Sequence, residues 1–260
     1  MTAHRRRSDR RRSDHRRRPG DRFPTVEGAL GPRDLGGLPA AGGHTRLGRV
    51  FAGGRRELMT ARGVEQLAGL GVRSIIDLRT AAEVGRRDSD PAVPEAAWQD
   101  FEILACPVED FDNAAYVVAI DHPFLNHPKQ YGLLLEHFPG LLHDALVRLA
   151  EAIEAGPVYI HCSAGRDRTG LVSAWMLQLA GVDPKVIGTE YVRSLAVVNE
   201  HHKTSGHPVE YFMRPREFAA WAGERHAALL DFLSAHPAAA ALEELRISSA
   251  HAAALATLRP

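Results

Sequence analysis

Cys162 and Arg168, six positions apart, are the pair of residues in this sequence best suited to nucleophilic chemistry. They lie in the stretch HCSAGRDRTG, residues 161–170, which follows the apolar run VYI at 158–160. A thiolate is a strong nucleophile, and a guanidinium can hold two phosphoryl oxygens in a planar, bidentate arrangement that an ammonium group cannot provide. The spacing therefore predicts that sulfur attacks a phosphorus atom held by Arg168.

A strand, a turn and a helix must position these two side chains. Residues 158–160 predict a short strand, and Leu171, Trp175 and Leu179 recur at helical spacing after the turn. Ligands of parallel α/β sheets bind beyond the carboxyl ends of the strands, where the first N–H groups of the next helix are free. We therefore expect the turn to bind an anion, with a positive field that favours the thiolate form of Cys162.

The predicted phosphate-binding loop contains a glycine where its backbone approaches the anion. Gly165 lacks the Cβ that would obstruct a close approach. Arg168 is expected to offset the charge that spreads over the equatorial oxygens in the transition state. The predicted phosphate-binding residues are Ser163, Ala164, Gly165, Arg166, Asp167 and Arg168.

Strands and helices alternate along the rest of the chain. Strands are predicted at 49–51, 72–78, 101–108 and 158–160, and the apolar runs at 72–78 and 101–108 are expected to be buried strands of a parallel sheet. Helices are predicted after the N-caps Thr60 and Asp183, from 141 to Gly156, and over the alanine-rich 208–260. Residues 109–140 predict interrupted helices, a candidate lid. The pattern favours an α/β domain with a central, mostly parallel sheet flanked by helices, a helical lid insertion and a helical C-terminus.

The stretch HCSAGRDRTG resembles the His-Cys-X5-Arg signature of the cysteine-dependent phosphatases. A basic residue and an aspartate precede the signature arginine, which makes the loop most similar to that of the bacterial tyrosine phosphatases of the mycobacterial protein tyrosine phosphatase B type. Three further stretches resemble this family: RDLGG at 33–37, GVRSIIDLRTAAE at 71–83 and, more weakly, EYVRSL at 190–195. The resemblance spans roughly residues 28–200.

This resemblance implies a cysteine-phosphatase-like domain and a metal-independent phosphomonoester hydrolase that works through a cysteinyl-phosphate. Cys162 would attack phosphorus and Arg168 would bind the phosphoryl group. His161 would orient the thiolate, and Thr169 would donate its hydroxyl to the departing sulfur. The implied substrates are phosphotyrosine and, with dual specificity, phosphoserine or phosphothreonine in proteins, or a phosphoinositide.

The leaving oxygen needs a proton, and several carboxyl groups could supply it. Asp167, inside the loop, is the leading candidate by resemblance to the family. Asp77 follows the predicted strand at 72–78 and is expected to reach the same crevice, where it shares or supports the role. Asp100, Asp110 and Asp112 are candidates by analogy with phosphatases whose acid lies on a mobile loop, although a plain surface carboxylate is the more common identity of each.

Three positions depart from the family pattern. Arg166 stands where the family typically has lysine; a second cation there would suit a substrate with several phosphates, and a loop arginine paired with a neighbouring carboxylate is an equal alternative. Pro32 replaces an aromatic residue. FAGG at 51–54 lacks an expected Arg-Ser, for which Arg55 or Arg56 is a candidate substitute.

Two other classes of function stay open at this stage. The first is a phosphate-binding module without turnover, for which the departures at 32 and 51–54 are the support. The retention of Cys162, Asp167 and Arg168 argues against it. The second class comprises other cysteine-based anion enzymes such as rhodaneses and arsenate reductases, which lack the GRDRTG continuation and the RDLGG segment.

Composition predicts one globular domain with an unusual N-terminal segment. The 260 residues are 45% hydrophobic and 25% charged, as in ordinary globular proteins. Residues 1–22 hold ten arginines against three aspartates, so 23–260 carry 22 basic and 29 acidic residues, a net charge of −7. We expect 1–22 to be a disordered tail and 23–260 to be a single phosphatase domain. The tail could also be an arm for nucleic acid or an anionic membrane.

The remaining residues with potential for chemistry suggest neither a metal site nor a disulfide. Cys106 lies in an apolar run and is predicted to pack in the core. His122, His127 and the pair at 201–202 show no spacing of a known closed metal site. We therefore expect no metal or cofactor, no membrane span, no nucleic-acid partner beyond the open question of the tail, and, without a signal peptide, a cytoplasmic bacterial protein. The sequence does not predict the oligomeric state.

Overall fold

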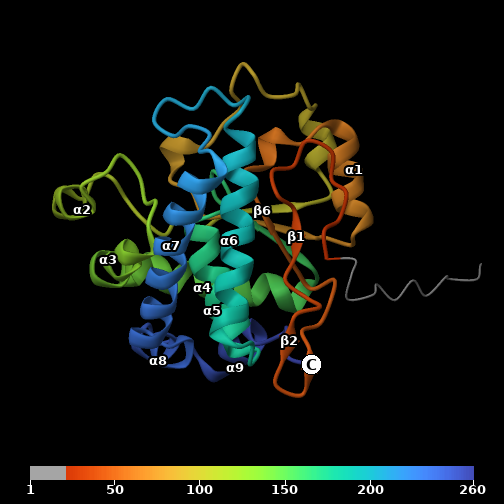
Figure 1. Cartoon of the computed structure of the whole chain (residues 1–260). Coiled ribbons are helices and arrows are strands. Elements are labelled where there is room, and N and C mark those ends of the chain that lie inside the picture. Colours follow the sequence, from red (N-terminus) through yellow and green to blue (C-terminus); the bar gives the residue numbers. More distant parts are fainter. Residues whose placement is uncertain (1–21) are drawn as a thin grey trace, which may run out of the picture.

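The computed structural model describes residues 22–260 and has a central five-stranded sheet (Figure 1). The strand order is β1-β4-β7-β5-β6, with β1 Arg33–Asp34, β4 Val50–Gly53, β5 Ser74–Asp77, β6 Glu102–Ala105 and β7 Val158–His161. The strands β4, β7, β5 and β6 pair in parallel, and β1 is antiparallel to β4. The predicted α/β class with a mostly parallel sheet is confirmed. A separate hairpin joins β2 Pro39–Ala40 to β3 Gly43–His44.

Helices follow the strands and form the C-terminal part of the chain. The α-helices are α1 Ala61–Gly69, α2 Ala114–Ile120, α3 Tyr131–His137, α4 Pro139–Ala155, α5 Arg168–Leu179, α6 Pro184–His201, α7 Pro215–Ala235, α8 Ala238–Glu244 and α9 Ser249–Leu255. Short 3-10 helices are η1 Arg56–Leu58, η2 Ala81–Glu83, η3 Glu95–Trp98 and η4 Pro128–Gln130. The predicted caps form as expected, because Thr60 accepts from the Gly63 amide and Asp183 accepts from the Lys185 amide.

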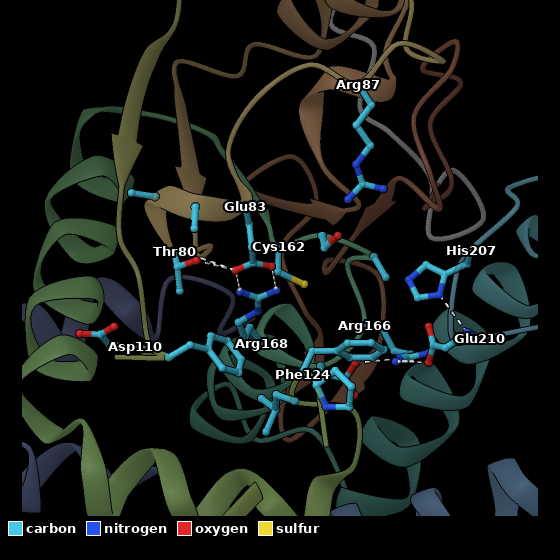
Figure 2. A pocket seen from close by; sticks show the side chains of 18 of the residues that line it. Thr80, Glu83, Arg87, Asp110, Phe124, Cys162, Arg166, Arg168, His207 and Glu210 are labelled. Atoms are coloured by element: carbon cyan, nitrogen blue, oxygen red, sulfur yellow. Dashed lines mark hydrogen bonds and ion pairs between the residues drawn. The ribbon is translucent and has the colours of Figure 1, made fainter. Parts of the chain in front are cut away.

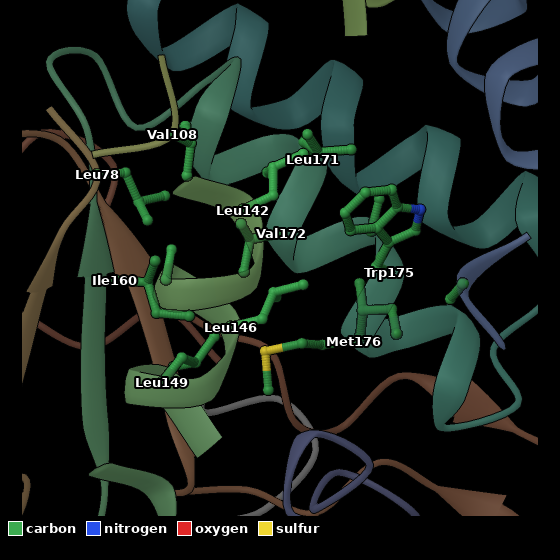
Figure 3. Packing of buried hydrophobic residues seen from close by; sticks show 14 of the residues in the cluster. Leu78, Val108, Leu142, Leu146, Leu149, Ile160, Leu171, Val172, Trp175 and Met176 are labelled. Atoms are coloured by element: carbon green, nitrogen blue, oxygen red, sulfur yellow. The ribbon is translucent and has the colours of Figure 1, made fainter. Parts of the chain in front are cut away.

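The alternation of side chains along each strand divides the core into two clusters. In β7, Tyr159 faces the smaller cluster with α1 and η3, whereas Val158 and Ile160 face the larger one. Figure 3 shows the larger cluster, in which Ile160 meets the leucines of α4 and the apolar side of α5. Both faces of the sheet are thus covered, and β7 is held at its centre.

The predicted strand at 101–108 forms as β6, but it is not a fully buried strand like β5. It pairs with β5 and lies at the edge of the sheet, where Glu102, Ile103 and Ala105 are exposed. An apolar run has the same composition in a central strand and in an edge strand with one covered face. The expectation of burial was therefore wrong, although the strand itself was correct.

The proposed tail at 1–22 lies outside the described residues except for Arg22. This arginine is buried, donates to the Gly36 carbonyl at 2.6 Å and pairs with Glu190 at 2.7 Å. The candidate lid at 109–140 contains α2, η4 and α3, in agreement with the predicted interrupted helices. Among residues 22–260, no helix is long and apolar enough to cross a membrane.

Candidate active site

The HCSAGRDRTG segment forms the predicted strand, turn and helix. His161 ends β7, Arg168 begins α5, and the loop between them lies at the carboxyl end of the parallel sheet. Neighbouring elements hold residues 162–168, which are called the phosphate loop after their predicted role. The Arg55 amide donates to the Ser163 carbonyl at 3.0 Å, and Arg33 Nη2 donates to the Gly165 carbonyl at 3.0 Å.

Gly165 is required at its position by two independent features. Its φ of +70° lies in the left-handed region that favours glycine. A Cβ at this residue would lie 2.2 Å from the carbonyl carbon and oxygen of Gly53. The loop therefore packs directly on the end of β4, where the FAGG departure from the family pattern supplies another glycine.

A cavity of about 620 Å³ opens above the phosphate loop (Figure 2). Cys162 lies at its base with 3% of its surface exposed. The walls come from the segment after β5, from the candidate lid and from the loop between α6 and α7; they comprise Thr80, Ala81, Ala82, Glu83, Arg87, Asp110, Phe111, Asp112, Pro123, Phe124, Leu125, His207 and Glu210. The candidate lid thus supplies part of the pocket wall.

The guanidinium of Arg168 lies in this pocket beside Cys162 and binds a carboxylate (Figure 2). Its Nη1 and Nη2 donate to the two oxygens of Glu83 at 2.5 and 2.6 Å, and Nη1 lies 3.1 Å from Glu109 Oε1. A bidentate pairing of this kind is the geometry in which an arginine also holds two phosphoryl oxygens. In this state Glu83 occupies the fork that a phosphoryl group would use.

Glu83 and Glu109 respond in opposite ways to burial in this site. Burial acts to raise the pKa of Glu83, but the hydrogen bonds and charge of Arg168 outweigh it and lower that pKa below its ordinary value. Glu109 is more deeply buried and accepts from the Tyr116 hydroxyl, and its burial raises its pKa despite Arg168. Neither residue was predicted from the sequence as a partner of Arg168, although Glu83 ends the family-like stretch at 71–83.

Asp167, the predicted proton donor, lies in the pocket and has a pKa shifted in the direction that favours its protonated form. It lines the pocket, it accepts from Arg166 Nε at 2.7 Å, and the Tyr191 hydroxyl lies 3.4 Å from its other oxygen. Burial raises the pKa of Asp167 even though Arg166 opposes the rise. A carboxyl group with a raised pKa keeps its proton at higher pH, as a general acid must.

Arg166 forms the carboxylate pairs that were the alternative to a second phosphate site. It is buried, and it binds Asp167 at 2.7 Å and Glu210 at 2.8 Å. Its guanidinium also lies 5.8 Å from the centre of the Trp221 ring. Both acidic partners use hydrogen-bond donors that a second phosphate would otherwise receive.

Asp77 lies behind the phosphate loop and does not line the pocket. It accepts from Arg79 at 2.8 and 2.6 Å, and its Oδ2 is 3.8 Å from His161 Nε2. Burial acts to raise the pKa of Asp77, but the hydrogen bonds and the charge of Arg79 outweigh it and lower that pKa. Asp77 is therefore an ionised carboxylate that binds Arg79, and it does not reach the pocket in which its predicted role was placed.

His161 is fully buried, and burial lowers its pKa to about 4. The ring is therefore neutral at pH 7, and because a carbonyl oxygen only accepts, Nδ1 carries the proton and donates to the Cys162 carbonyl at 3.1 Å. The adjacent Thr169 is also buried, and its Oγ1 has no hydrogen-bond partner among the described residues. That hydroxyl is therefore not committed to another acceptor.

The other predicted site residues separate into those in the pocket and those outside it. Asp110 and Asp112 line the pocket, whereas Asp100 is exposed elsewhere. Neither Arg55 nor Arg56 lines it: Arg55 pairs with Asp90, and Arg56 stacks on Trp98, so the suggested substitution for the missing Arg-Ser does not occur. Cys106 packs in the larger core cluster. Residues 22–260 contain no cluster of three or more His, Cys, Asp or Glu that could hold a metal ion.

Comparison with known proteins indicates the same family that the sequence of the phosphate loop resembles. The model described as "Tyrosine phosphatase family" matches residues 24–244. A protein of Cupriavidus necator named for tyrosine-protein phosphatase activity is 31% identical over 178 residues, which cover 66% of this chain and 62% of that protein. Triple specificity protein phosphatase PtpB of Mycobacterium tuberculosis is 30% identical over 193 residues, 65% of this chain and 68% of PtpB. A crystal structure of P. aeruginosa TpbA covers 74% of this chain and 89% of that one, at 17% identity and a TM-score of 0.32, too low to carry an argument.

Proposed function

Because this chain belongs to the tyrosine phosphatase family, we propose that it is a metal-independent phosphomonoester hydrolase that acts on phosphotyrosine through a cysteinyl-phosphate. One observation carries the proposal: the Cys162 thiol, the Arg168 fork and the Asp167 carboxyl all line a single cavity of about 620 Å³. A nucleophile, an oxyanion holder and an acid are the groups that a phosphomonoester requires.

In the first step the Cys162 thiolate attacks phosphorus, so that the S–P bond forms while the P–O bond to the leaving group breaks. Asp167 gives its proton to the leaving oxygen. Arg168 exchanges the carboxylate of Glu83 for two phosphoryl oxygens and balances their charge in the transition state. The exchange needs no other cation, because a carboxylate and a phosphoryl group can each present two anionic oxygens to the guanidinium.

In the second step water attacks the cysteinyl-phosphate, the S–P bond breaks and inorganic phosphate leaves. Asp167, now a carboxylate, accepts the proton of the attacking water. The Thr169 hydroxyl, which has no partner among the described side chains and backbone, stabilises the departing thiolate by donating to sulfur. The neutral His161 ring holds the Cys162 carbonyl and fixes the backbone of the nucleophile.

The pocket wall supports an aromatic phosphomonoester as the substrate. Phe111 and Phe124 come from the candidate lid and line the cavity above the phosphate loop. Flat rings are suited to packing against the ring of phosphotyrosine. By similarity to PtpB, whose name states triple specificity, we extend the proposal to phosphoserine, phosphothreonine and phosphoinositides as secondary substrates in a bacterial cytoplasm.

Turnover of para-nitrophenyl phosphate in EDTA tests the proposal, with Cys162→Ser and Asp167→Asn variants. Wild-type protein is expected to release phosphate without added metal, and Cys162→Ser should lose at least about 1000-fold in kcat because its hydroxyl is a much weaker nucleophile. Cys106→Ser is the matched control and should keep its activity, since Cys106 lies in the core. Undetectable wild-type turnover, together with phosphate binding, would instead support the non-catalytic module.

A further inference from the structure

Glu210 connects the phosphate loop to the loop between α6 and α7. Its Oε1 accepts from Arg166 Nη2 at 2.8 Å, and its Oε2 lies 3.3 Å from Nε2 of His202. Arg166 uses Nε for Asp167 at 2.7 Å. One buried guanidinium therefore bridges two carboxyl groups, and Figure 2 shows Arg166 and Glu210 beside each other in the pocket wall.

We propose that Glu210 is a positioning residue that, through Arg166, keeps Asp167 in the protonated form that a general acid needs. The inference rests on the proposed function. A cation at hydrogen-bond distance normally favours the ionised form of a carboxyl group. Glu210 also binds Arg166. Its negative charge therefore offsets part of the positive charge that Arg166 presents to Asp167.

The electrostatic environment of Asp167 agrees with this role. Burial is the largest influence and raises the pKa of Asp167, the charge of Arg166 opposes the rise, and the charge of Glu210 adds to it. His202 and His207, the other titratable neighbours of Glu210, both have pKa values lowered by burial. Because both imidazoles are neutral at pH 7, they do not cancel the negative charge of Glu210.

The remaining titratable groups around Asp167 do not replace Glu210. They come from the phosphate loop, the start of the candidate lid, α3, α6 and α7, and are Arg168, Glu109, Tyr131, Tyr191 and Arg225. The two tyrosines have pKa values raised by burial and are uncharged at neutral pH. Arg168 is itself paired with Glu83 and Glu109. Glu210 is thus the carboxylate that shares the cation nearest to Asp167.

The consequence for the reaction lies in the first step. The O–H bond of Asp167 breaks as its proton moves to the leaving oxygen, while S–P forms and P–O breaks. Without the charge of Glu210, a larger fraction of Asp167 starts as a carboxylate and has no proton to give. The loss should appear on the alkaline side of the pH profile, and more strongly for leaving groups that are poor without protonation.

The experiment is the pH dependence of kcat/KM for wild type, Glu210→Gln, Asp167→Asn and the double variant. Phenyl phosphate serves as the substrate with a poor leaving group and para-nitrophenyl phosphate as the one with a good leaving group. We expect Glu210→Gln to move the alkaline limb with phenyl phosphate to lower pH by about one unit. In the Asp167→Asn background, Glu210→Gln should leave the alkaline limb of the pH profile where it is.

Two further variants separate the electrostatic role from a structural one. Glu210→Asp keeps the negative charge, so its alkaline limb should stay near the wild-type position even if the variant protein unfolds at a lower temperature. Glu200→Gln is the matched control, because Glu200 is 62% exposed and pairs with Lys203 at 2.6 Å on the surface. It should leave the profile unchanged.

The outcomes distinguish this inference from the proposed function. An unmoved alkaline limb in Glu210→Gln, or an equal shift in the Asp167→Asn background, would overturn the inference while wild-type turnover upholds the function. If wild type shows no turnover, the proposed function fails instead. The protonation of Asp167 can then still be followed by carboxyl ¹³C NMR, where an unchanged titration in Glu210→Gln would overturn the inference separately.

Discussion

Cys106 and Cys162 are both buried, but they lie in different surroundings. Cys162 forms the base of an open cavity beside Arg168. Cys106 is enclosed by apolar side chains, and burial raises its pKa to about 11. Since the thiolate is the reactive form of cysteine, the two residues should differ sharply in reactivity at neutral pH.

Limited alkylation by iodoacetamide at pH 7 should therefore modify Cys162 and spare Cys106. Peptide mass spectrometry after partial reaction gives the site of labelling, and loss of phosphatase activity should follow labelling in a one-to-one ratio. If the loop binds phosphate as proposed, inorganic phosphate should slow the reaction. Equal labelling of both cysteines in the folded protein would contradict the environments described here.

At the scale of elements, the segment between β5 and η3 forms the wall opposite the phosphate loop and is fixed at two points. At its start, Glu83 accepts from the Thr80 amide at 3.0 Å, closing the turn of η2. At its far end, Asp90 pairs with Arg55 at 2.5 and 2.6 Å and accepts from the Arg87 amide at 2.7 Å. Arg55 lies two residues after the end of β4, so the sheet anchors the wall.

Asp90→Asn should destabilise the protein by about 3 kcal/mol, because it leaves the buried Arg55 without its charge partner. Urea unfolding at pH 7 measures the change. The neighbouring Asp88→Asn is the matched control, since Asp88 is exposed and should change stability by less than about 0.5 kcal/mol. Similar losses in both variants would show that the Arg55–Asp90 pair does not anchor the wall.

For the whole molecule, burial of the site links stability to pH through His161. This histidine ends the central strand and is enclosed on all sides, with a pKa of about 4 in the folded protein against the ordinary value of 6.5. Between these two values the unfolded chain binds a proton that the folded protein does not. The contribution of His161 to the free energy of unfolding is therefore fully present above pH 6.5 and is lost as the pH falls towards 4.

Replacing the imidazole of His161 should remove its part of the pH dependence of stability. Over this window the His161 contribution amounts to about 3 kcal/mol, and His161→Gln should show a correspondingly flatter curve of unfolding free energy between pH 7 and pH 4. The difference in unfolding free energy between the two proteins at each pH isolates the effect of His161, because the carboxyl groups that also titrate in this range are the same in both. Parallel curves would mean that His161 titrates alike in the folded and unfolded chain.

The local pattern of the sequence was sufficient to predict the strand, turn and helix around Cys162. The helical spacing after residue 170, the caps at Thr60 and Asp183 and the alternation of strands and helices depend on neighbours within a few positions. For the same reason Cys162, Arg168 and the turn between them could be recognised together. Which side chains pair across the site could not be predicted in this way.

Only the tertiary structure decided the partners of the charged groups, because those partners lie far apart in the chain. Glu83 pairs with Arg168 from the segment that follows β5, and Glu210 pairs with Arg166 from the loop after α6. The same distinction separates Asp77 from Asp167: both are carboxyl groups at the carboxyl end of a strand or in the loop beyond it, but Arg79 lowers the pKa of Asp77, whereas burial raises the pKa of Asp167. Sequence determined which groups are present, and folding determined their protonation, since a pKa depends on burial and on charges brought together in space.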